Sequence, residues 1–156
     1  MPIKIIRLLQ LFSYTLVTSQ VLFYLFILSD SLRVIKLENF FELRKVIDAL
    51  MIRRFKFMYY SCLACSVLAV IVSVGDTESS FFISSVVALV FLIVDLFITT
   101  KGSLPLNALA HTYNTGNETT DWEAVRIQWL NYMKYRGVAI TIGIMALLAG
   151  LVFGKN

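Results

Sequence analysis

The sequence predicts an all-α integral membrane protein, in which four spanning helices form a bundle and one amphipathic helix lies between the first two. Hydrophobic residues make up 58% of the 156-residue chain and charged residues 15%, whereas soluble domains have about 45–50% and about 25%. The mean hydropathy is +0.78. Four apolar runs account for this composition: residues 3–28, 57–74, 81–100 and 137–153.

Each run has close to the roughly 20 residues that cross a bilayer. Because lipid offers the backbone no hydrogen-bond partners, runs of this length predict helices. The first run begins with basic residues, as a signal peptide does, but it is too long for one and no small-residue cleavage site follows it. We therefore expect a retained helix and, without repeats or linkers, a single transmembrane domain over residues 1–156.

The positions of Lys and Arg predict the orientation in the membrane. Seven of the 14 basic residues lie between the first and second runs and four between the third and fourth, against three beside the termini. This bias predicts cytoplasmic connections and outer termini in a bacterial cytoplasmic membrane. The net charge of +4 is then a topology signal that favours contact with membrane lipids, and it does not indicate nucleic-acid binding.

Residues 39–55 are predicted to form the amphipathic helix. Asn39 and Glu42 have the spacing of a capping box. Apolar residues then recur at helical spacing on one side, with Arg44, Lys45 and Asp48 on the other. The helix either lies at the membrane interface or leads into the second span, and it either packs across the bundle or docks a partner.

The connection after the third run is expected to be a loop. It contains Gly102 and Pro105, and a turn is predicted further along, at Asn114, Gly116 and Asn117. Thr120 and Glu123 form a second capping box, so the last helix should start near residue 121 and run to residue 153.

Small residues recur on one face of that last helix, at Ala139, Gly143, Ala146 and Gly150. Such a face lets membrane helices approach closely. It packs either inside the bundle or between copies of the chain, as a homo-oligomer joined through Gly143 and Gly150.

Two tryptophans and two arginines share another face of the same helix, because their spacings repeat with the helical turn: Trp122, Arg126, Trp129 and Arg136. Tryptophan at a membrane interface is an ordinary anchor, and cytoplasmic arginine is an ordinary topology signal. Guanidinium and indole groups together also suit a flat, electron-rich or anionic ligand. Both interpretations of this stripe stay open.

Asp95 lies inside the third run, where a carboxylate is costly and usually has a partner or faces a cavity. Arg136 is the expected counter-ion, in a structural ion pair or in a proton-accepting site. The first run carries a polar stripe that either joins helices or lines a pocket, at Gln10, Ser13, Gln20 and Tyr24.

Cys62 and Cys65 form a CxxC inside the second run, but a cytoplasmic position disfavours a disulfide and two thiols make a poor zinc site. We interpret them as buried small residues. His111 is the only histidine and is either an ordinary loop residue, a general base or a lone haem ligand. No metal or cofactor is expected, although a bound haem or quinone is left open.

The run Leu104–Pro105–Leu106–Asn107, followed by Trp122, Arg126 and the Trp129-to-Arg136 spacing, resembles the anthrone-oxygenase-like family. These are small four-helix membrane proteins, most of them catalogued as a domain of unknown function. The segment from Phe40 to Lys45 is also similar to the interhelical region of bacterial members. The likeness covers essentially the whole chain through short motifs.

The resemblance implies an oxidoreductase that oxidises an anthrone to an anthraquinone with molecular oxygen and without metal or flavin. Asn107 and Arg136 would hold the developing oxyanion, and Trp122 and Trp129 would stack on the planar substrate, with Arg126 in support. His111 or Asp95 would be the base. Met133 departs from the family pattern, in which a polar residue is usual. The alternative is a non-enzymatic membrane protein that binds lipid or a partner subunit.

Overall fold

The computed structural model describes residues 2–113 and 120–154, and all regular structure within these ranges is helical. The predicted turn at Asn114, Gly116 and Asn117 lies outside the described residues. The chain forms these elements in order, the two labelled η being π-helical: α1 (Pro2–Phe23), η1 (Tyr24–Leu28), α2 (Ser29–Val34), α3 (Leu37–Ser73), α4 (Ser80–Ile98), η2 (Thr99–Ser103), α5 (Leu104–His111) and α6 (Trp122–Val152).

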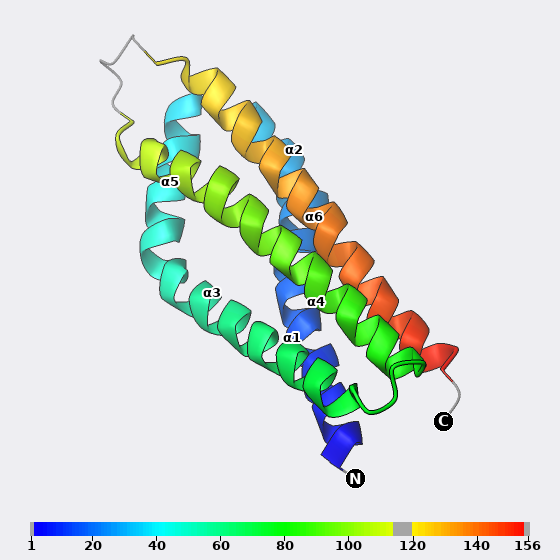
Figure 1. Ribbon diagram of the computed structural model, residues 1–156. Coiled ribbons are helices and arrows are strands. Elements are labelled where there is room, and N and C mark those ends of the chain that lie inside the picture. Colours follow the sequence, from blue (N-terminus) through cyan, green and yellow to red (C-terminus); the bar gives the residue numbers. More distant parts are fainter. Residues whose placement is uncertain (1, 114–119, 155–156) are drawn as a thin grey trace.

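The long helices form a four-helix bundle (Figure 1). α1 packs against α3 and α6, and α4 packs against the same two helices. Both ends of the chain and the α3–α4 turn lie at one end of the bundle, whereas α2 and α5 lie at the other (Figure 1). Within the described ranges, four segments are long and apolar enough to cross a membrane: Ile3–Val34, Ile52–Ser73, Ser80–His111 and Trp122–Val152. The predicted all-α, multi-pass architecture is confirmed.

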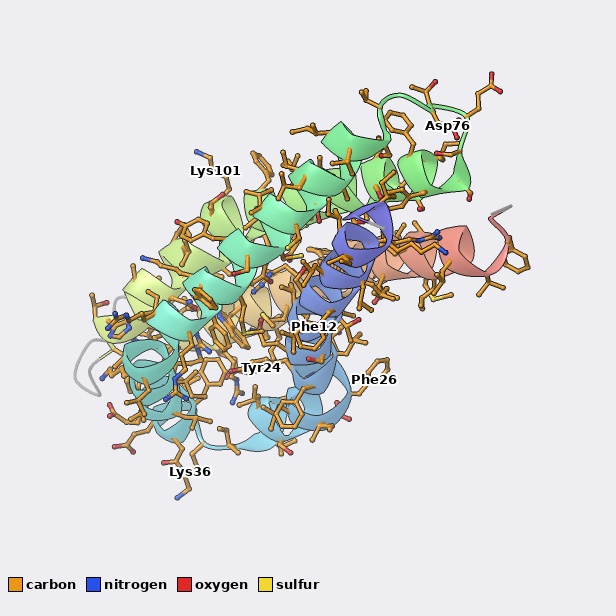
Figure 2. The ribbon with its side chains drawn as sticks, turned by 90° about the horizontal axis from the view of Figure 1, so that it is seen from below. Phe12, Tyr24, Phe26, Lys36, Asp76 and Lys101 are labelled. Atoms are coloured by element: carbon orange, nitrogen blue, oxygen red, sulfur yellow. The ribbon has the colours of Figure 1, made fainter. Side chains whose placement is uncertain are left out.

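The burial pattern is that of a bundle surrounded by lipid. Large apolar side chains point outward, as Phe12 and Phe26 do with 62% and 82% of their surface exposed; Figure 2 shows Phe26 extended away from the helices. Polar side chains lie inside, and Gln10 and Asp95 are fully buried. No span has more than 39% of its most apolar window buried. A soluble bundle would bury such a face, whereas a membrane protein needs it outside.

The predicted amphipathic helix is not a separate element. α3 begins at Leu37, its N-cap residue Lys36 makes no side-chain capping bond, and the helix continues without a break to Ser73. The predicted capping box at Asn39 and Glu42 is therefore wrong. No Gly or Pro interrupts residues 39–73, so nothing in the chain ends the helix, although its axis changes direction (Figure 1). Of the two alternatives, the helix leads directly into the second span.

The first and third helical segments are longer than predicted. Helical structure extends from α1 through η1 and α2 to Val34, and from α4 through η2 and α5 to His111. The expected loop at Gly102 and Pro105 is therefore wrong. Pro105 lies just after the π-helical η2, and local π-helical adjustments let a membrane helix accommodate the missing N–H of a proline. Asn107 consequently lies on a helix.

α6 starts at the predicted position but with a different cap. Asp121 is the N-cap, and its carboxylate accepts a hydrogen bond from the Ala124 amide at 3.0 Å. The predicted capping box of Thr120 and Glu123 is therefore wrong. Glu123 instead pairs with Arg126, 2.5 Å away.

The small-residue face of α6 packs inside the chain. A Cβ atom on Gly143 would lie 1.7 Å from the Tyr14 hydroxyl, and one on Gly150 would lie 2.3 Å from the Ser84 hydroxyl. These glycines therefore permit the close approach of α1 and α4 to α6. Association between copies of the chain stays a prediction.

Candidate functional site

A cavity of about 460 Å³ lies in the half of the bundle that contains α5. Its walls come from all four spanning segments, with Tyr24 from η1, Tyr59 from α3, Asn107 from α5 and Met133 from α6 among the lining residues. The volume is in the range of small-molecule sites, which commonly have apolar walls and a few placed polar groups. We take this cavity as the candidate site.

One end of the cavity is formed by a buried ion pair. Arg136 Nε donates to Asp95 Oδ1 at 2.9 Å, and another guanidinium nitrogen donates to the Tyr59 hydroxyl at 2.6 Å. Asp95 is fully buried and Arg136 is 6% exposed. The predicted pairing of Asp95 with Arg136 is confirmed. Arg136 lines the cavity, whereas Asp95 lies behind it and acts on the cavity through the guanidinium.

Asn107 is held by two donors. Its side-chain oxygen accepts from Trp129 Nε1 at 2.8 Å and from the Arg44 guanidinium at 3.1 Å. Indole and guanidinium groups can only donate, so the amide orientation is fixed by its partners. The Asn107 amide nitrogen is then the group that can face the cavity, and it donates to no residue that the structure describes. Asn107 is therefore a preoriented donor.

Arg44 and Asp48 are site residues that the periodicity of the sequence did not reveal. The helical spacing predicts that both lie on the polar side of an amphipathic helix, but Arg44 is only 5% exposed and lies 4.5 Å over the Trp129 ring. Arg44 pairs with Asp48, whose other oxygen lies 3.5 Å from His111 Nε2. The spacing of four between Arg44 and Asp48, typical of a helical ion pair, was the available signal.

The polar residues of the third span follow a regular spacing that includes the predicted Asp95, Asn107 and His111. A polar side chain occurs at every fourth position over five positions: Asp95, Thr99, Ser103, Asn107 and His111. On an α-helix of about 3.6 residues per turn, a step of four advances by about 40°, so the set would spread over about 160°. The π-helical η2 adds about one residue to a turn and offsets about 100° of this spread. Four of the five residues consequently line the cavity.

The tryptophan–arginine stripe of α6 divides into two parts. Trp129 and Arg136 line the cavity. Trp122 instead packs edge-on against Phe41, with ring centroids 5.2 Å apart. Arg126 donates at 2.8 Å to the carbonyl of Ile35, the C-cap residue of α2, a common role for a cation at a helix C-terminus. As far as the described residues define the cavity, Trp122 and Arg126 lie outside it.

The polar stripe of α1 also divides. Gln10 accepts a hydrogen bond from Ser85 of α4 at 3.0 Å, and Ser13 donates to the Gln10 carbonyl. Gln20 and Tyr24 line the cavity. The two alternatives for this stripe, joining helices and lining a pocket, thus apply to its opposite ends.

The cysteines lie apart from the cavity in the described part of the chain. Cys62 is buried and Cys65 half-buried, and both are free thiols. Residues 2–113 and 120–154 contain no group of three His, Cys, Asp or Glu side chains arranged to hold a metal ion. The polar groups that line the cavity are the amide, hydroxyl, guanidinium and imidazole groups described above, together with the Asp48 carboxylate and the Lys56 ammonium group.

A scan against models of known protein families, a search of curated proteins and a search of solved structures found no match to this chain. The resemblance to the anthrone-oxygenase-like family stays a prediction from the motifs at Leu104–Asn107 and Trp129–Arg136. The site must accordingly be interpreted from its own geometry.

Proposed function

We propose that the cavity binds a planar, lipophilic aromatic compound that carries an oxygen atom, such as a phenol, an anthrone or a quinone. The observation that carries this proposal is the Asn107 amide, whose oxygen is occupied by Trp129 and Arg44 and whose nitrogen is left to donate. A ligand oxygen would accept from this nitrogen, and the aromatic residues around it would cover the ring faces.

The charges of the cavity favour a neutral ligand over an anion. Arg44 is paired with Asp48, and Arg136 is paired with Asp95. Each buried guanidinium is therefore already compensated. Lys56 also lines the cavity and has no ion pair among the described residues, but it is exposed, so a carboxylate beside the two buried guanidiniums would be desolvated without an uncompensated cation next to it. A carbonyl or phenol oxygen carries no such cost.

The same proposal includes a position in the cell. The charge bias predicts that the cavity end faces the cytoplasm of a bacterial cell, with both termini outside. Exposed residues on the two sides of the cavity include Ile52 of α3 and Leu104 of α5. Because these side chains are apolar, a lipophilic ligand would enter between α3 and α5 from the membrane.

Ligand binding can be measured by fluorescence, because the chain has only two tryptophans and they occupy different surroundings. Anthraquinone would be titrated into the protein in lipid nanodiscs, with anthracene as the ligand that lacks oxygen. We expect anthraquinone to quench the emission of Trp122→Phe, in which Trp129 remains beside the cavity, more strongly than that of Trp129→Phe, in which Trp122 remains about two helical turns away. Asn107→Leu should weaken anthraquinone binding about two- to tenfold, as the loss of a hydrogen bond worth about 0.5–1.5 kcal/mol.

Two results would contradict the proposal. One is quenching that disappears in Trp122→Phe and persists in Trp129→Phe. The other is an anthraquinone affinity equal to that of anthracene and unchanged in Asn107→Leu. Either would favour the alternative, a non-enzymatic protein that binds lipid or a partner subunit.

A second candidate function, oxidation of an anthrone by molecular oxygen, is supported by the pairing of His111 with Asp48 beside the cavity. Asp48 Oδ2 lies 3.5 Å from His111 Nε2 and makes no hydrogen bond among the described residues. A slightly closer approach on ligand binding would place the proton on Nε2 and leave the other ring nitrogen as the base. The base takes a ring C–H proton, the carbanion reduces oxygen to a bound hydroperoxide, and loss of water forms the second carbonyl. Anthrone and oxygen thus give anthraquinone and water.

Oxygen consumption with anthrone, compared with empty nanodiscs, tests this candidate. His111→Gln should lower the protein-dependent rate by about 10²-fold or more, the usual contribution of a general base, whereas Cys65→Ala serves as the unchanged control. Anthraquinone binding without protein-dependent oxygen uptake would refute the reaction and leave the binding proposal intact.

A further inference from the structure

Two hydroxyl groups on η2 differ from most of those along the spanning helices. Serine and threonine hydroxyls in a helix commonly donate to a carbonyl three or four residues earlier. Thr18 does so to Tyr14 at 2.8 Å, and Thr100 to Phe97 at 3.1 Å. Such bonds use the hydroxyl proton within its own helix, so the hydroxyl can no longer donate to a ligand.

Thr99 and Ser103 do not make this bond. Their hydroxyl oxygens are buried and have no hydrogen-bond partner in the described part of the chain, and both residues line the cavity. Ser103 as a whole is only 3% exposed. The side-chain oxygen of Gln20, which lines the same cavity from α1, is also buried without a partner. Buried polar groups normally have hydrogen-bond partners, so a ligand in the cavity would supply the partner that these three groups lack.

Their position in the fold separates them from the other polar groups of the cavity. Thr99 follows Asp95 by four residues, and Ser103 precedes Asn107 by four. Asp95 is bonded to Arg136, and the Asn107 oxygen is bonded within its own cluster. The two unpartnered hydroxyls therefore lie between two clusters that are each held by a charged hydrogen bond, although single atoms of Asp95, Asp48 and Arg44 also lack a partner among the described residues.

η2 is also fixed against the rest of the bundle. A Cβ atom on Gly102 would lie 2.5 Å from the Tyr132 ring of α6. The glycine lets the π-helical turn approach α6 closely. π-helical turns inside α-helices occur frequently at functional sites, and here the turn presents Thr99 and Ser103 to the cavity.

We propose that Thr99, Ser103 and Gln20 form a subsite for a hydroxyl group on the ring system of the ligand. This subsite rests on the proposed function and narrows the ligand of the cavity to aromatic compounds with a ring hydroxyl. The Gln20 oxygen can only accept, whereas the two hydroxyls can donate and accept. A substituent that satisfies all three must itself donate, so a phenolic hydroxyl fits and a methyl ether does not.

The test compares three ligands by tryptophan quenching: β-hydroxyanthraquinone, its methyl ether and unsubstituted anthraquinone. We expect the protein to bind the hydroxyl compound about fivefold to tenfold more tightly than the methyl ether, the range for one or two hydrogen bonds. The double variant Thr99→Val and Ser103→Ala should lose this preference while its affinity for anthraquinone changes less than twofold.

Ser66→Ala is the matched control, because Ser66 also has a buried hydroxyl on a spanning helix but lies outside the cavity. It should keep the preference for the hydroxyl compound. Without ligand, the double variant should melt at a temperature no lower than that of the unaltered protein, since it removes no hydrogen bond. A lower melting temperature would mean that the hydroxyls have a structural role and would overturn the subsite.

The outcomes separate this inference from the proposed function. If anthraquinone binds but the protein does not prefer the hydroxyl compound, or if the double variant keeps the preference, the subsite is refuted and the cavity remains a binding site. If none of the three ligands binds, the proposed function fails, and the subsite fails with it.

Discussion

Replacing either member of the Asp95–Arg136 pair should destabilise the bundle by far more than breaking a neutral hydrogen bond between membrane helices. Removing one partner of a buried ion pair costs about 3–5 kcal/mol, because the other charge stays buried. Asp95→Asn should lower the free energy of unfolding by about 3 kcal/mol, since Arg136 keeps its 2.6 Å hydrogen bond to Tyr59. Arg136→Gln should lower the free energy of unfolding by about 4 kcal/mol, because the second Asp95 oxygen has no other partner among the described residues.

The double variant leaves two neutral side chains and should cost about 4 kcal/mol, so that the coupling between the two sites is about 3 kcal/mol. The measurement is a double-mutant cycle, in which the free energy of unfolding is obtained from titration with sodium dodecyl sulfate in mixed micelles and followed by circular dichroism. Raising the salt concentration should leave the coupling unchanged, because a buried pair is only weakly screened.

A small coupling would refute this reasoning. Hydrogen bonds between membrane helices average about 0.6 kcal/mol in such cycles. A coupling of about that size, or one that falls as salt is added, would mean that water or lipid headgroups reach the pair. The assignment of Asp95 as the residue that holds Arg136 in place would then be wrong.

Two further substitutions test the packing and the start of α6. Gly143→Ala should cost about 1–3 kcal/mol in the same titration by overpacking, since the added carbon would meet the Tyr14 hydroxyl, whereas Gly75→Ala should be nearly neutral because nothing lies within 4 Å. Asp121→Ala should lower the stability by about 1 kcal/mol, as the loss of an N-cap does, and Thr120→Ala should not. Equal effects within either pair would contradict the contacts described.

The four spans could be predicted because length and hydropathy determine them almost alone. The Asp95–Arg136 pair could be predicted too, since few partners can compensate a carboxylate at that depth. The ends of the helical segments could not. Pro105 and Gly102 are strong signals for a loop, but Pro105 lies where a helix tolerates it and Gly102 is required by the ring of Tyr132.

The composition of the site was harder to foresee than its position. Arg44 has the helical spacing of a solvated residue, and only tertiary packing over Trp129 buries it. Trp122 and Trp129 have equivalent places on one helical face, yet only Trp129 lines the cavity. The position of Thr99 and Ser103 in the cavity wall could not be predicted, because residues spaced by four drift around an α-helix and no simple sequence pattern indicates a π-helical turn.

Because of the π-helical turn η2, a related chain could keep this fold and still lose the cavity site. A relative that lacked one residue between Thr99 and Ser103 would run as an uninterrupted α-helix and would still cross the membrane four times. Everything after the deletion would rotate by about 100°, and Asn107 would turn away from Trp129. Alignments of related chains should therefore be examined for a one-residue gap in this turn, which would mark proteins that share the architecture but have a different ligand or none.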